Sequence, residues 1–138
     1  LLAAAGLNRL GLGDRARGFL DPWAAPVAPG QGALALQCRA DSPWAEWIAR
    51  LNDPATEACV AAERGALTAL EANCRTAMGA FARIDGDGIN LAVEALTPDG
   101  TVRWRREGRS AADPVAARAL GLALGASIRD QAGDRILA

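Results

Sequence analysis

Residues 77–108, AMGAFARIDGDGINLAVEALTPDGTVRWRREG, carry the clearest structural pattern in this chain. It contains three candidate strands, AMGAFARI, INLAVEAL and TVRWRREG, in which the pattern of side chains is strand-like rather than helical. DGDG at 85–88 separates the first two runs and PDG at 98–100 separates the next two. Asp-Gly turns between apolar runs are strong hairpin signals. The stretch therefore predicts a three-stranded antiparallel meander.

The two faces of this meander are predicted to differ. The central run places four apolar side chains on one face: Ile89, Leu91, Val93 and Ala95. The third run places charged side chains at alternate positions: Arg103, Arg105 and Glu107. The apolar face needs a cover, and residues 53–71 and 113–133 have helical periodicity and begin with Asp-Pro, a cap followed by proline. Residues 53–138 are therefore predicted to form an α+β unit in the order helix, meander, helix.

The first 52 residues are predicted to be incomplete pieces of α/β domains. Residues 1–10 suggest a helix, 33–39 (ALALQCR) a short buried strand, and 43–52 a second helix. A lone strand without a partner does not make a stable sheet. The chain also begins without Met and inside a helical run, so we expect a fragment of something longer. Three tryptophans are expected to be exposed in it: Trp23, Trp44 and Trp47.

Composition narrows the function. The chain has 138 residues, 15 basic and 16 acidic side chains and a net charge of −1, which argues against nucleic-acid binding and a polybasic membrane anchor. No apolar run approaches the roughly 18–20 residues that span a bilayer, and no signal peptide opens the chain. We therefore expect a cytoplasmic protein. There is no His, and the three cysteines form no CxxC pair, so no metal site is expected.

Cys74 lies at the junction between the predicted helix and the first strand, within LEANCRTAMG at 70–79. Arg75 follows it, and a neighbouring cation favours the reactive thiolate. From its position alone, however, Cys74 is better explained as a small residue that fills a turn than as a thiol that has a function. Cys38 and Cys59 fall inside apolar periodicity and are predicted to be core residues.

Two further features are ambiguous by themselves. In APGQGA (28–33), the glycines beside Gln31 allow close backbone approach to a ligand, but a tight loop before a strand explains them about as well. Arg9 and Arg15 can bind carboxylates through paired hydrogen bonds, or they can be solvated cations near a helix end. No pair of side chains suggests general acid–base catalysis. From these residues an anion-binding α+β module without enzymatic activity and a reactive-thiol domain both remain open.

Taken in order, the segments resemble the C-terminal part of the hydroxymethylbilane synthase (porphobilinogen deaminase) family. The resemblance covers nearly the whole chain, and it is the order of the motifs that makes it specific. The matching stretches are LAAAGLNRLGL (2–12), VAPGQGALALQCR (27–39), AERGALTALE (62–71), EANCRTAMGAF (71–81) and DGDGINLAVEALTPDG (85–100).

This resemblance implies a transferase that joins four porphobilinogen units into hydroxymethylbilane, releasing ammonia, in the biosynthesis of heme, chlorophyll and cobalamin. It implies a dipyrromethane cofactor bound through a thioether to Cys74, with Gln31 and Gly32 in the loop near that cofactor. Arg9 and Arg15 match family positions that bind the acetate and propionate groups of the pyrroles. Porphobilinogen and the growing pyrrole chain would be the partners, with no nucleic acid and no membrane.

The family has three domains, which gives the chain an expected division. Residues 1–26 would close the second domain, 27–52 would return to the first as loop, strand and helix, and 53–138 would form the third, which bears the cofactor. The family's catalytic Asp lies in the first domain, outside these residues. No catalytic residue is therefore expected in this chain, which is predicted to be inactive alone, and the full-length parent is expected to be a monomer.

The segment around Cys74 departs from the family pattern. Two glycines usually precede the cysteine and a glutamine follows it, whereas here they are Ala72, Asn73 and Arg75. The usual Val-Pro-Ile-Gly is Thr-Ala-Met-Gly. The cysteine itself is retained.

Overall fold

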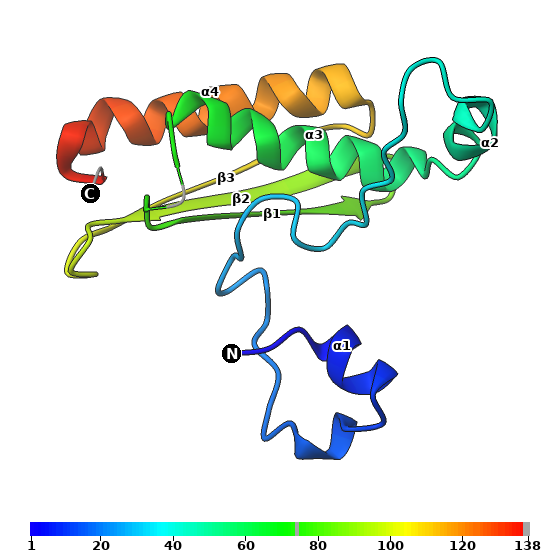
Figure 1. The fold of residues 1–138 in the computed structure, drawn as a ribbon. Coiled ribbons are helices and arrows are strands. Elements are labelled where there is room, and N and C mark those ends of the chain that lie inside the picture. The colour runs from blue at the N-terminus through cyan, green and yellow to red at the C-terminus, as the bar shows by residue number, and fades with distance from the viewer. Residues whose placement is uncertain (74, 137–138) are drawn as a thin grey trace.

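The computed structural model describes residues 1–73 and 75–136. A three-stranded sheet is covered on one face by two long helices, and the N-terminal residues lie on the opposite side of the sheet (Figure 1). In chain order the elements are α1 (Ala4–Arg9), η1 (Gly13–Arg15), α2 (Ala45–Ala49), α3 (Pro54–Ala69), β1 (Met78–Asp85), β2 (Gly88–Leu96), β3 (Arg103–Ala111), α4 (Pro114–Ala132) and η2 (Gly133–Ile136).

The predicted α+β unit with an antiparallel meander is confirmed. The sheet order is β1-β2-β3, and both neighbouring pairs are antiparallel. The first hairpin closes at the Asp85–Gly88 pair, and Gly86 in its turn has a φ of 64°. Gly100 takes a φ of 71° in the second turn. Both turns thus place glycine where the backbone is left-handed, which other residues adopt at a cost.

The core lies between the sheet and the helix layer. The predicted apolar face of β2 is fully buried: Ile89, Leu91, Val93 and Ala95. The residues that cover it from the helix layer are mostly alanines, Ala58, Ala62, Ala66 and Ala117, together with the larger Leu70 and Ile128. Asp53 and Asp113 cap the two helices as predicted, since the Asp53 carboxylate accepts from the Thr56 amide at 2.7 Å and Asp113 accepts from two first-turn amides.

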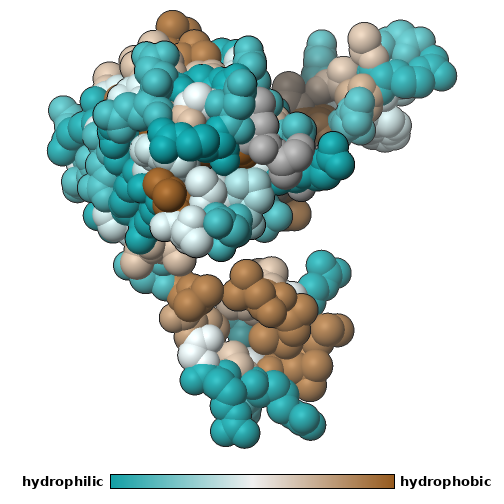
Figure 2. Space-filling model, turned by 90° about the vertical axis from the view of Figure 1, so that its left-hand side faces the viewer, coloured by the Kyte–Doolittle hydropathy of each residue, from teal (hydrophilic) through white to brown (hydrophobic). Residues whose placement is uncertain are grey.

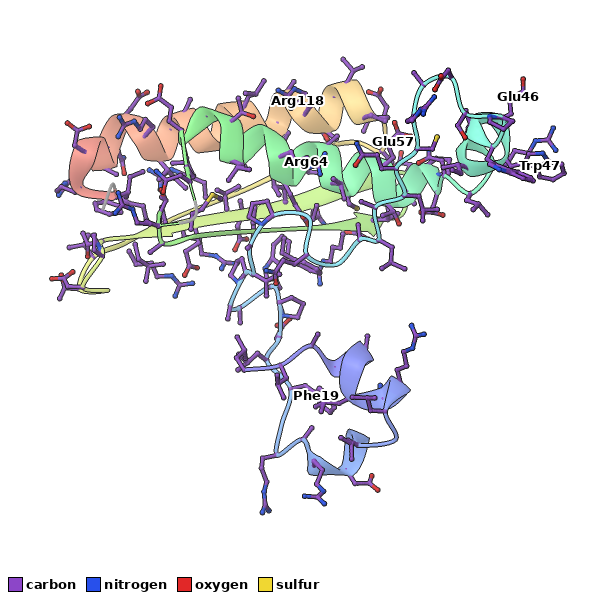
Figure 3. The ribbon with its side chains drawn as sticks, in the orientation of Figure 1. Phe19, Glu46, Trp47, Glu57, Arg64 and Arg118 are labelled. Carbon is purple, nitrogen blue, oxygen red and sulfur yellow. The ribbon has the colours of Figure 1, made fainter. Side chains whose placement is uncertain are left out.

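The two long helices touch through glycine. The sequence suggests only that Gly65 weakens α3 slightly, but the structure gives it a packing role. A Cβ at Gly65 would overlap the carbonyl oxygen of Arg118 in α4, and a Cβ at Gly121 would overlap that of Ala62 in α3. The helix backbones therefore meet with no side chain between them, while Arg64 and Arg118 are exposed on the outside of the helix layer (Figure 3).

The predicted strand at 33–39 is wrong. Residues 34–39 have no regular structure, Leu34 is 98% exposed, and Cys38 is exposed rather than in a core. A strand needs neighbouring backbone to take up its hydrogen bonds, and no other strand pairs with this segment in the described part of the chain. The helices expected at 1–10 and 43–52 do form, but only as the short α1 and α2.

Large apolar side chains are exposed on both pieces that precede α3. On residues 1–22, called the N-terminal piece below, they gather into a patch, visible in Figure 2, that includes Leu2, Leu10 and Phe19. Trp44 and Trp47 are 65% and 61% exposed around α2, at the end of the molecule where α3 begins (Figure 3). Among the described residues, the helices are too short or too polar for any of them to cross a membrane.

The isolated chain is expected to dimerise or aggregate, because contiguous exposed apolar patches promote association. Small-angle scattering over a concentration series measures this directly. Substituting Trp44 and Trp47 by Ser should reduce the association, since these side chains contribute much of the exposed area around α2. A monodisperse monomer at all concentrations would contradict the expectation.

Candidate functional site

The predicted anchor, Cys74, lies outside the described residues. The residues on either side of Cys74 are described. Helix α3 ends at Ala69, Glu71 has a left-handed φ of 51°, and β1 begins at Met78. The Asn73 side chain accepts a hydrogen bond from the Arg75 amide at 2.8 Å, and the Thr76 hydroxyl accepts one from the Asn73 amide at 3.1 Å. Two residues that depart from the family pattern, Asn73 and Arg75, thus bond to one another.

Residues 23–33, called the strap below, cross from the N-terminal piece to α3 and bind the α+β unit at several points. Trp23 lies under two guanidinium groups of the sheet, with Arg83 at 4.5 Å and Arg105 at 5.8 Å from the ring. Its carbonyl accepts a hydrogen bond from Arg105 at 2.7 Å. Trp23 is therefore half-buried, unlike the exposed tryptophan that the sequence suggested.

The second attachment is at the edge of β1. The Val27 carbonyl accepts a hydrogen bond from the Ala80 amide at 2.9 Å. Close approach is possible because residue 79 is glycine, and a Cβ there would overlap the Pro26 carbonyl. Gly79, five residues after Cys74, thus allows the strap to lie against the start of β1.

The third attachment is Glu63 of α3, which sequence reasoning missed. Only 7% of this residue is exposed. Its Oε2 accepts from the Gly30 amide at 2.7 Å, and its Oε1 accepts from the Ala82 amide at 2.9 Å. Burial raises the pKa of the Glu63 carboxyl, and these two N–H groups oppose that shift by favouring the charged form. The sequence did contain a signal for Glu63: it is a glutamate on the apolar stripe of α3, four residues after Cys59.

A cavity of about 250 Å³ adjoins this attachment. Its lining includes Gly32, Cys59, Glu63 and Phe81, and it lies between the strap, α3 and β1. Burial, and then the charges of Glu63 and Asp53, raise the pKa of the Cys59 thiol, while the Ile84 amide lowers it. Because the thiolate is the reactive form, Cys59 is a poor nucleophile and suits a half-buried packing role.

The structure does not place the predicted site residues Arg9, Arg15 and Gln31 at this cavity. Arg9 ends α1 and Arg15 ends η1, and both are exposed on the N-terminal piece, on the opposite side of the sheet from α3 (Figure 1). α1 and η1 contact one another. Gln31 is exposed in the turn formed by residues 28–33, called the strap loop below. Within residues 1–73 and 75–136, no three His, Cys, Asp or Glu side chains cluster as metal ligands would.

Lowering the pH from 7 toward 5 is expected to stabilise the wild-type chain relative to a Glu63→Gln variant. The folded-state pKa of Glu63 is raised above its ordinary value, so the folded chain takes up a proton before the unfolded chain does. Stability then rises as the pH falls through the folded-state pKa. Urea unfolding of both proteins at several pH values gives the difference in unfolding free energy. A difference that is constant with pH, or that falls on acidification, would contradict this.

Two family models match the chain in succession. "Porphobilinogen deaminase, dipyromethane cofactor binding domain" matches residues 1–46, and "Porphobilinogen deaminase, C-terminal domain" matches residues 57–130. The second match covers the α3–sheet–α4 unit and is in keeping with its α+β fold. The first ends near the start of α2, so the two matches together cover most of the chain.

Curated relatives agree with these matches. A porphobilinogen deaminase of Caulobacter vibrioides is 55% identical over 141 residues, which cover 99% of this chain and 44% of the relative. That of Caulobacter sp. strain K31 is 53% identical over 143 residues, with the same coverage. That of Nitrobacter winogradskyi is 39% identical over 138 residues, covering 98% of this chain and 42% of the relative. The chain thus spans less than half the length of these relatives, and it belongs to the porphobilinogen deaminase family.

Proposed function

We propose that this chain is the cofactor-anchoring part of a transferase that condenses four porphobilinogen units into hydroxymethylbilane and releases ammonia, in tetrapyrrole biosynthesis. The observation that carries the proposal is the succession of the two family matches, at 1–46 and 57–130, along one chain. The name of the first match supports dipyrromethane as the cofactor. We expect the protein to act in the cytoplasm.

In this proposal Cys74 holds the cofactor through a thioether, since sulfur is the strongest nucleophile among the protein side chains that form such bonds. Gln31 and Gly32 would contact the cofactor from the strap loop. The Gly30 bond to Glu63 supports this role, because it ties the loop to α3, the helix that leads toward Cys74. Bound dipyrromethane would supply the pyrrole end to which the first substrate unit is joined.

Arg9 and Arg15 are proposed to bind the carboxylates of the substrate and of the growing chain. Arg guanidinium groups form paired hydrogen bonds with carboxylates. Both side chains are exposed, and neither forms an ion pair with any of the residues that the structure describes. They are therefore available to a ligand.

The domain division that we propose follows the family template. Residues 1–26 belong to the second domain, 27–52 to the first and 53–138 to the third. The distribution of apolar surface supports it, because residues from 58 onward supply the buried core whereas Leu34, Trp44 and Trp47 are exposed. Exposed surface of this kind is typical of a face that packs against another domain.

We assign no proton-transfer role to any residue of this chain. By the family template, the catalytic Asp lies in the part of the first domain that these residues do not include, so the chain alone is proposed to be inactive. The complete enzyme is proposed to act as a monomer. An assay for ammonia or hydroxymethylbilane on the isolated chain should show no turnover.

A chimera tests the proposal. This chain replaces the matching 141 residues of the Caulobacter vibrioides relative, and the unaltered relative is the control. The chimera should release ammonia from porphobilinogen, give the colour of pyrroles with Ehrlich's reagent, and have an intact mass greater than its sequence by one dipyrromethane. A chimera that is folded by circular dichroism but carries no pyrrole and has no activity would overturn the proposal.

A further inference from the structure

Strand β1 is an edge strand, and the strap and α3 together cover its free side. β2 pairs with only one side of β1, so alternate amides of β1 point away from the sheet. Such amides need acceptors, because an unpaired strand edge invites association and a buried unpaired amide is costly. The Ala80 amide donates to the Val27 carbonyl and the Ala82 amide donates to the Glu63 carboxylate.

The Glu63 carboxylate has the hydrogen-bonding chemistry that its surroundings require. Both of its partners are backbone N–H groups, which only donate, and each donates to a different carboxylate oxygen. An ionised carboxylate only accepts, so it can satisfy both. A glutamine of the same shape would turn its NH₂ group toward one of the two donors. At 7% exposure, water has little access to compensate for that loss.

We propose that Glu63 is a positioning residue for the cofactor site. It binds β1 at Ala82 and the strap loop at Gly30, and it is itself part of α3. α3 and β1 are the two elements that flank the segment containing Cys74. Glu63 therefore fixes the loop that carries Gln31 relative to both ends of that segment. This inference rests on the proposed function for its meaning, but the loop attachment can be tested without it.

The first test uses the 138-residue chain and hydrogen exchange measured by mass spectrometry. In Glu63→Gln, amides of residues 28–33 should exchange about tenfold faster or more, as expected when a charged hydrogen bond is lost. Peptides of α4 should exchange as in the wild type. The matched control is Glu57→Gln, an exposed glutamate on the same helix whose Oε2 accepts from Asn52, a bond that a glutamine oxygen can keep (Figure 3).

Glu63→Asp is the second variant, in case the glutamine variant does not fold. It keeps the negative charge but is one methylene shorter, so it cannot reach both amides from the same backbone position, and one attachment should be released. Unchanged exchange in residues 28–33 would overturn the proposal. Equal acceleration in the strap loop and α4 would also overturn it, because that outcome describes a loss of overall stability.

The second test uses the chimera. Glu63→Gln should lower kcat by about tenfold or more, while pyrrole colour stays close to that of the parent chimera and circular dichroism shows that the variant is folded. Unchanged kcat would overturn the positioning role. Absence of pyrrole in the parent chimera would instead overturn the proposed function, and the exchange experiment would still decide whether Glu63 holds the loop.

Discussion

Cys74→Ser is expected to leave the chimera without covalent pyrrole and without activity above background. A serine hydroxyl is almost entirely protonated near neutral pH and is a weak nucleophile, whereas a cysteine reacts through its thiolate, which is intrinsically very nucleophilic. The serine variant therefore cannot form the attachment. Intact mass and Ehrlich's reagent measure the cofactor directly, and ammonia release measures turnover.

The other cysteines provide matched controls for this result. Cys38→Ser and Cys59→Ser should keep the added mass, because Cys38 lies outside the strap and α3, and Cys59 has a raised pKa. Pyrrole colour that survives Cys74→Ser would refute the assignment of the anchor. Loss of colour in Cys59→Ser instead, with the fold retained, would move the anchor to α3.

Gly121→Ala is expected to destabilise the chain by about 3 kcal/mol, the upper part of the range for overpacked cores. Alanine in a helix normally gains about 1 kcal/mol over glycine. Here the added methyl would overlap the Ala62 carbonyl and would also lie 2.9 Å from the Ala66 nitrogen. Both contacts are with backbone, which cannot turn aside as a side chain can. α3 and α4 would have to move apart along a contact that is central to the core.

Urea unfolding followed by circular dichroism measures this loss. Gly6→Ala is the control, because it places the same methyl on α1, where a Cβ at Gly6 has no neighbour within 4 Å. That variant should be neutral or slightly more stable. Equal stability of Gly121→Ala and the wild type would show that the two helices can separate without cost.

The sequence predicts best where structure depends on local pattern. Alternation and Asp-Gly turns suffice for the meander, and Asp-Pro suffices for the starts of α3 and α4. The prediction at 33–39 was wrong because an apolar run becomes a strand only beside another strand, and none pairs with it in the described residues. The Gly65 prediction missed the packing role because that role depends on Arg118, more than fifty residues away.

The candidate site shows the same limit. The motif APGQGA marks a loop, but the residue that holds it is Glu63, 33 positions from Gly30. Only the fold brings the two together. A glutamate within an apolar helical stripe is a usable signal that something must satisfy it, although the stripe does not identify the partners. The order of the neighbouring motifs predicts Cys74 as the anchor, and both this assignment and the attachment chemistry stay predictions.

The strap is attached largely through its main chain. The groups that it contributes are the carbonyls of Trp23, Ala24 and Val27 and the amide of Gly30. Almost any residue provides these atoms. Three of the four partner groups belong to particular side chains, those of Arg105, Arg103 and Glu63, and the fourth is the Ala80 amide. Tolerance to substitution should therefore be unequal across this contact: a mutational scan would accept many residues at positions 24 and 27 and few at Glu63 or Arg105.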